Sequence, residues 1–167
     1  SFNNDKVLSI IDKILNDDEV SVVAEVMGGL NPSYEFTKQL LKSGKHVVTS
    51  NKELVATHGT ELLKIAKENN VNYLFEASVG GGIPIIRPMN EALTAEKLEA
   101  ITGILNGTTN YILTKMQNEG ANFDDVLKQA QDLGYAELHP EADVEGFDAC
   151  RKIAILSSLM VGKTVNY

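Results

Sequence analysis

The N-terminal half of the chain alternates between two spacings of apolar residues. In residues 5–16 the apolar side chains recur at helical spacing, and residues 21–26 form a short β-branched run, which predicts a helix followed by a strand. Residues 31–44 then indicate one compact helix, with Asn31 as its N-cap, Pro32 at the first helical position and a glycine at its end.

The alternation continues with a second strand, a helix and a third strand. Residues 46–50 are predicted as a strand, residues 53–70 as a helix that is bent or broken near Gly59, and residues 71–77 as a third strand. This β-α-β-α-β order with short connections favours parallel strands joined by right-handed crossovers. We therefore expect an α/β fold that contains a partial Rossmann-like parallel sheet.

The predicted strands end in residues suited to ligand binding. In open α/β sheets, ligands bind beyond the carboxyl ends of the strands. Those ends read MGG at residues 27–29, TSNK at residues 49–52 and EASVGGG at residues 76–82, so all of them are rich in glycine or polar residues. This coincidence favours a ligand cleft over a plain scaffold.

The pattern changes after residue 82, where we expect a second domain. The expected elements are a proline-interrupted helical stretch (85–93), a strand (97–105), two helices that end in glycine (106–120 and 123–134) and a well-buried apolar helix (147–162). A lone strand needs partners that this chain does not supply, so the second domain looks cut short. The prediction is two domains, residues 1–78 and residues 79–167, the second of them truncated.

Composition excludes several classes of protein. A net charge of -8 and a pI near 4.9 argue against a nucleic-acid partner, which rewards clustered Lys and Arg. The longest apolar run, residues 153–161, is too short to span a bilayer. The single cysteine, Cys150, cannot form an internal disulfide, which fits the cytoplasm. The chain begins with Ser1 rather than Met, so it is either a processed product or an internal piece of a larger protein, and the truncated second domain favours the internal piece.

The densest charge lies in residues 134–152, directly before the apolar run of the last helix. If that helix begins near residue 147, Asp148 and Lys152 lie four residues apart on one face, in the order that favours pairing. An exposed pair of this kind contributes only about 0.3–0.5 kcal/mol, so a surface salt bridge is one interpretation. The other is a proton-transfer pair, because the apolar continuation draws this turn toward the core. Carboxylates for a substrate ammonium group are available at Glu137, Asp143 and Glu145.

Three further features are candidates for a site. Lys52 follows the second strand, and it either faces the cleft, where it could hold a carboxylate or phosphate, or lies in solvent. The triplet at residues 80–82 lacks the third glycine of G-x-G-x-x-G, so it is either a flexible turn or, with Glu76, a loop that holds a cofactor edge or a small cation. His139 has no second His or Cys at ligand spacing and is interpreted as a loop residue.

Five segments resemble the homoserine dehydrogenase family. They are VAEVMGGLNP, GKHVVTSNKELVA, FEASVGGGIPII, GILNGTTNYILTKM and GYAE followed by ADVEGFDACRKIAIL, which together run over nearly the whole chain. The resemblance implies a nicotinamide-binding Rossmann domain joined to a catalytic α+β domain that also forms a homodimer. It also implies the interconversion of L-homoserine and L-aspartate 4-semialdehyde with NAD or NADP, on the route to threonine and methionine.

The resemblance also assigns roles to individual residues. It makes Lys152 the proton donor or acceptor at the reacting oxygen, with Asp148 as its partner. It brings Lys52 to the substrate and the nicotinamide, and Glu137, with Asp143 nearby, to the substrate ammonium. Cofactor contacts would come from Gly28, Gly29, Lys52 and Gly80, and a monovalent cation such as Na⁺ would be held by Glu76 and the backbone of Val79, Gly81 and Ile83.

Two departures from the family pattern and two alternatives accompany this interpretation. Leu138 and His139 stand where the family usually has a small residue or Pro and then Asp, so one acid of the substrate loop is missing. No G-x-G-x-x-G occurs in the chain, so we expect it to lack the pyrophosphate site. A related amino-acid semialdehyde reductase is one alternative, and a non-catalytic self-association module that pairs through exposed sheet edges is the other.

Overall fold

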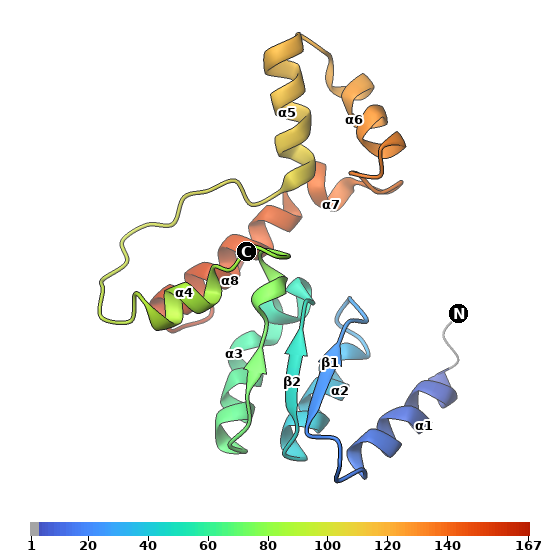
Figure 1. Cartoon of the computed structure of the whole chain (residues 1–167), viewed down its shortest axis with the longest axis vertical. Coiled ribbons are helices and arrows are strands. Elements are labelled where there is room, and N and C mark those ends of the chain that lie inside the picture. The colour runs from blue at the N-terminus through green and yellow to red at the C-terminus, as the bar shows by residue number, and fades with distance from the viewer. Residues whose placement is uncertain (1–3) are drawn as a thin grey trace.

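A three-stranded parallel sheet lies at the centre of the N-terminal half of the molecule (Figure 1). The computed structural model describes residues 4–167, with side chains from Ile10 onward. Strands β1 (Val22–Glu25), β2 (His46–Thr49) and β3 (Tyr73–Leu74) lie in the order β1-β2-β3. All neighbours pair in parallel, so the predicted β-α-β-α-β order and α/β class are confirmed.

One face of this sheet is covered and the other is open. Helices α2 (Ser33–Lys42) and α3 (Lys52–Glu68) lie behind the sheet in Figure 1, and α1 (Asn4–Leu15) lies beside α2. The core between sheet and helices includes the fully buried Leu40, Leu41, Val47, Leu54 and Leu62. On the open face, the exposed side chains are Val22, Ala24, Val48 and Leu74. The helical pattern in residues 5–16 includes Val7 and Leu8, whose side chains lie outside the described side chains.

Two local predictions in this half are wrong. Helix α3 runs without a break through Gly59, where an added Cβ would come within 3.3 Å of Val55 Cγ1, so this glycine serves packing rather than bending. Helix α2 begins at Ser33 and its N-cap is Pro32, with no side-chain cap from Asn31. The first turn is closed by the backbone instead, because the N–H of Tyr34 donates to the carbonyl of Leu30 at 2.8 Å.

The second half is helical. Its elements are the 3-10 turn η1 (Glu76–Ser78) and helices α4 (Ile86–Glu91), α5 (Gly107–Glu119), α6 (Phe123–Asp132), α7 (Glu141–Val144) and α8 (Phe147–Val161). Helices α5 and α6 form a hairpin that projects away from the sheet, whereas α8 returns to pack against α3 (Figure 1). Ile155 and Leu156 of α8 are buried in the same core as α3, so one hydrophobic core joins the two halves.

The predicted strand at residues 97–105 is not a strand in the described structure. The chain between α4 and α5 is irregular there and makes no ladder with β1, β2 or β3. A strand is stable only when neighbouring strands take up its backbone hydrogen bonds, which explains the difference. Within residues 4–167, no helix has both the length and the apolar character needed to cross a membrane.

Candidate active site

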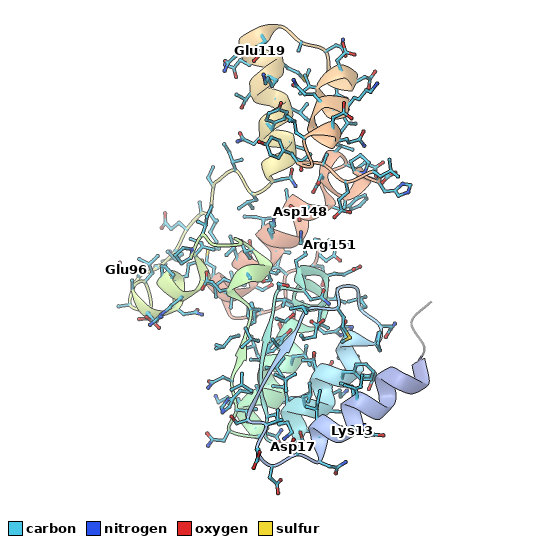
Figure 2. All side chains as sticks on the ribbon, turned by 45° about the vertical axis from the view of Figure 1, so that its right-hand side comes forward. Lys13, Asp17, Glu96, Glu119, Asp148 and Arg151 are labelled. Atoms are coloured by element: carbon cyan, nitrogen blue, oxygen red, sulfur yellow. The ribbon has the colours of Figure 1, made fainter. Side chains whose placement is uncertain are left out.

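A buried carboxylate lies between two lysines where α8 meets α3. Asp148, in the first turn of α8, is only 2% exposed, and its Oδ2 lies 2.8 Å from Nζ of Lys152 one turn later. Its Oδ1 accepts a hydrogen bond from Nζ of Lys52, the first residue of α3. Figure 2 shows Asp148 at the junction between the sheet half and the α5–α6 hairpin. The predicted pair of Asp148 and Lys152 therefore forms, but its carboxylate is buried and is shared with a second lysine.

Local structure and packing explain how the two helices deliver these side chains. The side chain of Asn51 caps α3 by accepting from the N–H of Leu54 at 3.1 Å, so α3 starts with Lys52 at the carboxyl edge of the sheet. Gly146 has φ +85°, which lets the chain turn sharply from α7 into α8. A second ion pair, Arg151 to Glu53 at 3.1 Å, ties the same turn of α8 to α3.

A second carboxylate joins the cluster through a side-chain amide. Nδ2 of Asn106 lies 2.8 Å from Oδ1 of Asp143 and 2.9 Å from Oδ2 of Asp148, so it donates to both. Oγ1 of Thr108 lies 3.1 Å from Oδ2 of Asp143. Sequence reasoning did not single out Asn106 or Thr108. The signal that could have found them is the NGTT segment, which has an Asn N-cap pattern at the start of a helix.

The charges in the cluster favour an ionised Asp148. Burial by itself would raise the pKa of this carboxyl, but hydrogen bonds from Lys152, Lys52 and Asn106 outweigh it and hold the pKa below its usual range. Nζ of Lys152 also donates to the carbonyl of Leu105 at 2.9 Å. The two lysines therefore share a carboxylate that is ionised at neutral pH.

The cluster faces an open cleft of about 590 Å³. The lining consists of Lys52, Asn106, Gly107, Thr108, Tyr111, Tyr135, Asp143, Asp148 and Lys152. The side chain of Lys52 is 39% exposed and that of Lys152 is 15% exposed, so the amine of Lys52 is the more accessible one. An amine at such a wall can exchange a proton with a bound hydroxyl, and Asp143 can receive a cationic group.

Other residues predicted from the charged stretch lie outside this cleft lining. Glu137 is exposed, and its backbone carbonyl accepts from Nε2 of Gln131 at 3.0 Å. Glu145 and His139 are also exposed, with Nδ1 of His139 lying 3.8 Å from Oε1 of Glu141. The substrate role of Glu137 stays a prediction.

The loops after β1 and β2 form one hydrogen-bonded unit at the carboxyl edge of the sheet. The buried Glu25 accepts from the N–H of Met27 at 2.7 Å and from Oγ1 of Thr49 at 2.6 Å. Nδ2 of Asn51 donates to the carbonyl of Gly29 at 2.6 Å. Gly28 and Gly29 both have positive φ, and a Cβ at either would meet nothing within 4 Å. The two glycines therefore leave bare, accessible backbone where a flat cofactor ring could approach.

The glycine triplet makes a tight turn beside η1. A Cβ at Gly80 would lie 2.5 Å from the carbonyl oxygen of Ile83, so only glycine fits there. Both carboxylate oxygens of Glu76 accept backbone N–H groups at the start of α4, those of Ile85, Ile86 and Arg87 at 2.6–2.8 Å.

Glu76 is thereby an ionised helix cap. Burial opposes the charge, but the three backbone hydrogen bonds outweigh it and lower the pKa of Glu76. Within the described side chains, no group of three or more His, Cys, Asp or Glu residues could hold a metal ion. A monovalent cation held mainly by carbonyls is a different kind of site and stays a prediction.

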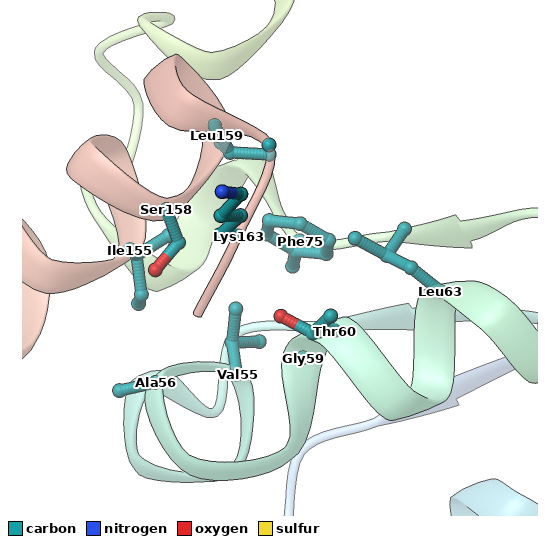
Figure 3. A pocket seen from close by; sticks show the side chains of 11 residues that line it. Val55, Ala56, Gly59, Thr60, Leu63, Phe75, Ile155, Ser158, Leu159 and Lys163 are labelled. Carbon is teal, nitrogen blue, oxygen red and sulfur yellow. The ribbon is translucent and has the colours of Figure 1, made fainter. Parts of the chain in front are cut away.

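A separate apolar cleft of about 270 Å³ lies between α3, Phe75 and the C-terminal end of α8 (Figure 3). Val55 and Leu63 line it from α3, and Ile155 and Leu159 line it from α8. Its one charged lining residue is Lys163, and no carboxylate borders it. This cleft is lined by no acid–base pair, so the Asp148 cluster is the better candidate for an active site.

The fold and the cluster define a class of parallel α/β proteins with a lysine–carboxylate cluster beyond the strand ends. The family model "Homoserine dehydrogenase, NAD binding domain" matches residues 1–76, and the model "Homoserine dehydrogenase" matches residues 84–167. The chain belongs to the homoserine dehydrogenase family. The resemblance of the five sequence segments is thereby confirmed.

Individual relatives agree with this assignment. The homoserine dehydrogenase of Synechocystis sp. is 50% identical, and the match covers 93% of this chain and 36% of that protein. The homoserine dehydrogenase of Bacillus subtilis is 52% identical, and the match covers 87% of this chain and 34% of that protein. The crystal structure of the Thiobacillus denitrificans enzyme has a TM-score of 0.87 at 45% identity, covering 97% of this chain and 39% of that one. A hyperthermophilic archaeal homoserine dehydrogenase in complex with NADPH has a TM-score of 0.85 at 35% identity, covering 92% and 48%. The chain spans about a third of the length of these two curated relatives.

Proposed function

We propose that this chain forms part of an NAD(P)-dependent homoserine dehydrogenase, which interconverts L-homoserine and L-aspartate 4-semialdehyde on the route to threonine and methionine. The observation that carries the proposal is the cluster of Lys52 and Lys152 around the buried carboxylate of Asp148, beside Asp143 at the carboxyl edge of the sheet. It combines groups for proton transfer and for ammonium binding in one cleft.

Different residues of the site bind L-homoserine and transfer its hydroxyl proton. Lys152 takes the proton of the substrate hydroxyl, or returns it in the reverse direction, because its amine lines the cleft while Asp148 fixes its position. The more exposed Lys52 contacts the substrate and the nicotinamide. Asp143 and Glu137 bind the substrate ammonium. Holding both ends of a small zwitterion in this way orients the hydroxyl carbon for reaction.

A bound nicotinamide dinucleotide supplies the hydride acceptor or donor. Gly28, Gly29 and Gly80, together with Lys52, would hold its reactive end, and the open backbone at Gly28 and Gly29 is suited to a flat ring. The archaeal relative in complex with NADPH supports NADP as one candidate. Na⁺ or another monovalent cation would be held by Glu76 and by the backbone carbonyls of Val79, Gly81 and Ile83. The last three residues line the same cleft.

The proposal includes the setting of the enzyme. Cys150, the single cysteine of the chain, is free and half-buried, which fits a reducing compartment, the cytoplasm. A homodimer follows from the family resemblance.

The test is turnover by the complete polypeptide that contains these 167 residues. L-homoserine should reduce NAD or NADP, followed by nicotinamide absorbance, whereas L-serine, one methylene shorter, should react far more slowly because its hydroxyl cannot reach Lys152 while its ammonium is held. Failure to oxidise L-homoserine with either nucleotide would refute the proposed activity.

A further inference from the structure

The orientation of the Asn106 side chain is determined by its position as the N-cap of α5. Its Oδ1 accepts from the N–H of Thr109 at 2.8 Å and from the Oγ1 of the same residue at 2.8 Å. A backbone N–H can only donate, so this oxygen is assigned unambiguously and Nδ2 must face the other way. The amide is thus forced to present its hydrogens to the active-site cluster.

Those two hydrogens reach two different carboxylates. Nδ2 donates to Asp143 of α7 and to Asp148 of α8, and Asn106 itself is 7% exposed. Two carboxylates that share one small site normally repel each other. A neutral donor between them satisfies one oxygen of each and holds them at a set separation.

We propose that Asn106 is a positioning residue that fixes the substrate-binding carboxylate of Asp143 relative to the catalytic anchor Asp148. This inference rests on the proposed function. Asn106 does not contact the substrate itself. Its amide acts through Asp143, which receives the ammonium, and through Asp148, which orients Lys152.

Two substitutions separate this role from helix capping. Asn106→Ser and Asn106→Asp both keep a good N-cap oxygen, because Ser, Asp and Asn are nearly equivalent caps, but both remove the Nδ2 donor. The matched controls are Asn122→Ser and Asn122→Asp. Asn122 caps the neighbouring helix α6 by accepting from the N–H of Asp125 at 2.9 Å, and its Nδ2 donates to the carboxylate of the same Asp125. Asn122 is exposed and outside the cleft lining, so its variants lose a cap-side amide in solvent rather than in the cluster.

The kinetic measurement uses the complete enzyme. In both Asn106 variants kcat/KM for homoserine should fall by roughly 10–100-fold, since small misplacements of reacting groups have effects of that order. The KM for homoserine should rise while the KM for the nucleotide stays unchanged. A purely structural role would instead lower the amount of active enzyme and leave both KM values alone. Asn122 variants should stay within about twofold of the parent.

Thermal melts give a readout that needs no activity. In Asn106→Asp a third carboxylate faces Asp143 and Asp148, so one carboxyl pKa should rise. The other titratable groups around this position are Lys52 of α3, Lys152 of α8, and Tyr111 and Tyr135 of the cleft wall. A raised folded-state pKa means that the destabilisation is full at high pH and relieved as pH falls. The Tm deficit of Asn106→Asp should therefore be larger at pH 8 than at pH 5. Asn122→Asp places its new carboxylate beside Asp125, but solvent screens this pair, so the pH dependence of its Tm should be much smaller.

The outcomes decide between the two claims. Asn106 variants that match the Asn122 variants in KM and in the pH dependence of Tm would overturn the inference. If Asn106→Asp does not fold, Asn106→Ser carries the kinetic test. If the parent does not oxidise homoserine, the proposed function fails by itself, and the melts still decide whether Asn106 holds the two carboxylates together.

Discussion

At the residue scale, the unusual feature is a carboxylate whose two oxygens serve different partners. Oδ1 of Asp148 accepts a hydrogen bond from Lys52, and Oδ2 accepts from Lys152 and Asn106. A buried charge is tolerated only when its hydrogen bonds are satisfied, and here an ammonium or amide donor reaches each oxygen. This arrangement makes the position of each lysine depend on one side chain.

The first residue-level prediction concerns Lys152→Met in the complete enzyme. The change keeps most of the side-chain volume and removes the amine, so folding should survive while turnover falls by roughly 10²–10⁴, the usual effect of losing a general acid or base. Lys115→Met is the matched control, because Lys115 also forms an ion pair with a residue four positions away on its helix, Glu119, outside the cleft lining. Homoserine turnover within about threefold of the parent would make Lys152 a salt-bridge residue and Lys52 the next candidate.

Asp148→Asn tests the anchor itself. The variant should slow turnover, and the free energy of unfolding at pH 7 should drop by about 1–3 kcal/mol, since the lysines lose their shared partner. The double variant with Lys152→Met should lose less activity than the sum of the single effects, because the two residues act together. Asp125→Asn, in the first turn of α6, is the control, and additive losses would mean that Asp148 and Lys152 work independently.

The pH dependence of that stability difference has a defined sign. The folded-state pKa of Asp148 is lowered, so its stabilising contribution is complete above the unfolded pKa near 4 and is lost as pH falls through the folded value. Denaturant melts of parent and Asp148→Asn should therefore converge in acid. A constant gap down to the lowest pH at which both fold would contradict an ionised Asp148.

At the scale of elements, the start of α4 depends on a carboxylate from the preceding turn. Glu76→Gln should lower the free energy of unfolding by about 1–2 kcal/mol at pH 7, because three N–H groups of the first turn lose a charged acceptor. The pKa of Glu76 is lowered, so this difference should shrink as pH falls below about 4. Urea melts measure it.

Glu91→Gln is the control for this prediction. Glu91 ends the same helix and pairs with Arg87 in solvent, so its loss should change stability by less than about 0.5 kcal/mol. Equal effects of the two substitutions would remove the special role of Glu76. If adding Na⁺ stabilises the parent but not Glu76→Gln, the proposed cation site gains direct support.

At the scale of the whole molecule, α8 unites the two halves. Its apolar residues Ile155 and Leu156 enter the core of the sheet half, and its first turn carries the site. Parallel sheets are ordinarily covered on both faces, whereas one face here exposes Val48 and Leu74. Because Lys52 comes from α3 and Asp148 and Lys152 come from α8, the candidate site exists only when α8 is docked on α3.

The glycine pattern of the chain leads to a prediction on nucleotide binding. The chain has no G-x-G-x-x-G, so these 167 residues alone should bind NAD or NADP weakly or not at all, because the pyrophosphate lacks its helix N-terminus. Fluorescence titration of the chain alone, compared with the complete enzyme, measures this. Micromolar affinity for the chain alone would contradict it.

The sequence by itself determined the features that depend on local periodicity. Alternating strand and helix patterns predicted the parallel sheet, and the strand ends predicted that Gly28, Gly29 and Lys52 lie at its carboxyl edge. The spacing of Asp148 and Lys152 predicted their pairing, because residues four apart on a helix are neighbours whatever surrounds them.

Only the tertiary structure decided what surrounds that pair. Lys52 reaches Asp148 across 96 residues and Asn106 reaches it across 42, which no local pattern records. The same holds for the missing strand at residues 97–105, since a strand requires neighbours and its own sequence cannot supply them. Burial of Asp148 follows from the docking of α8 on α3, and that docking turns a common surface pair into a candidate catalytic centre.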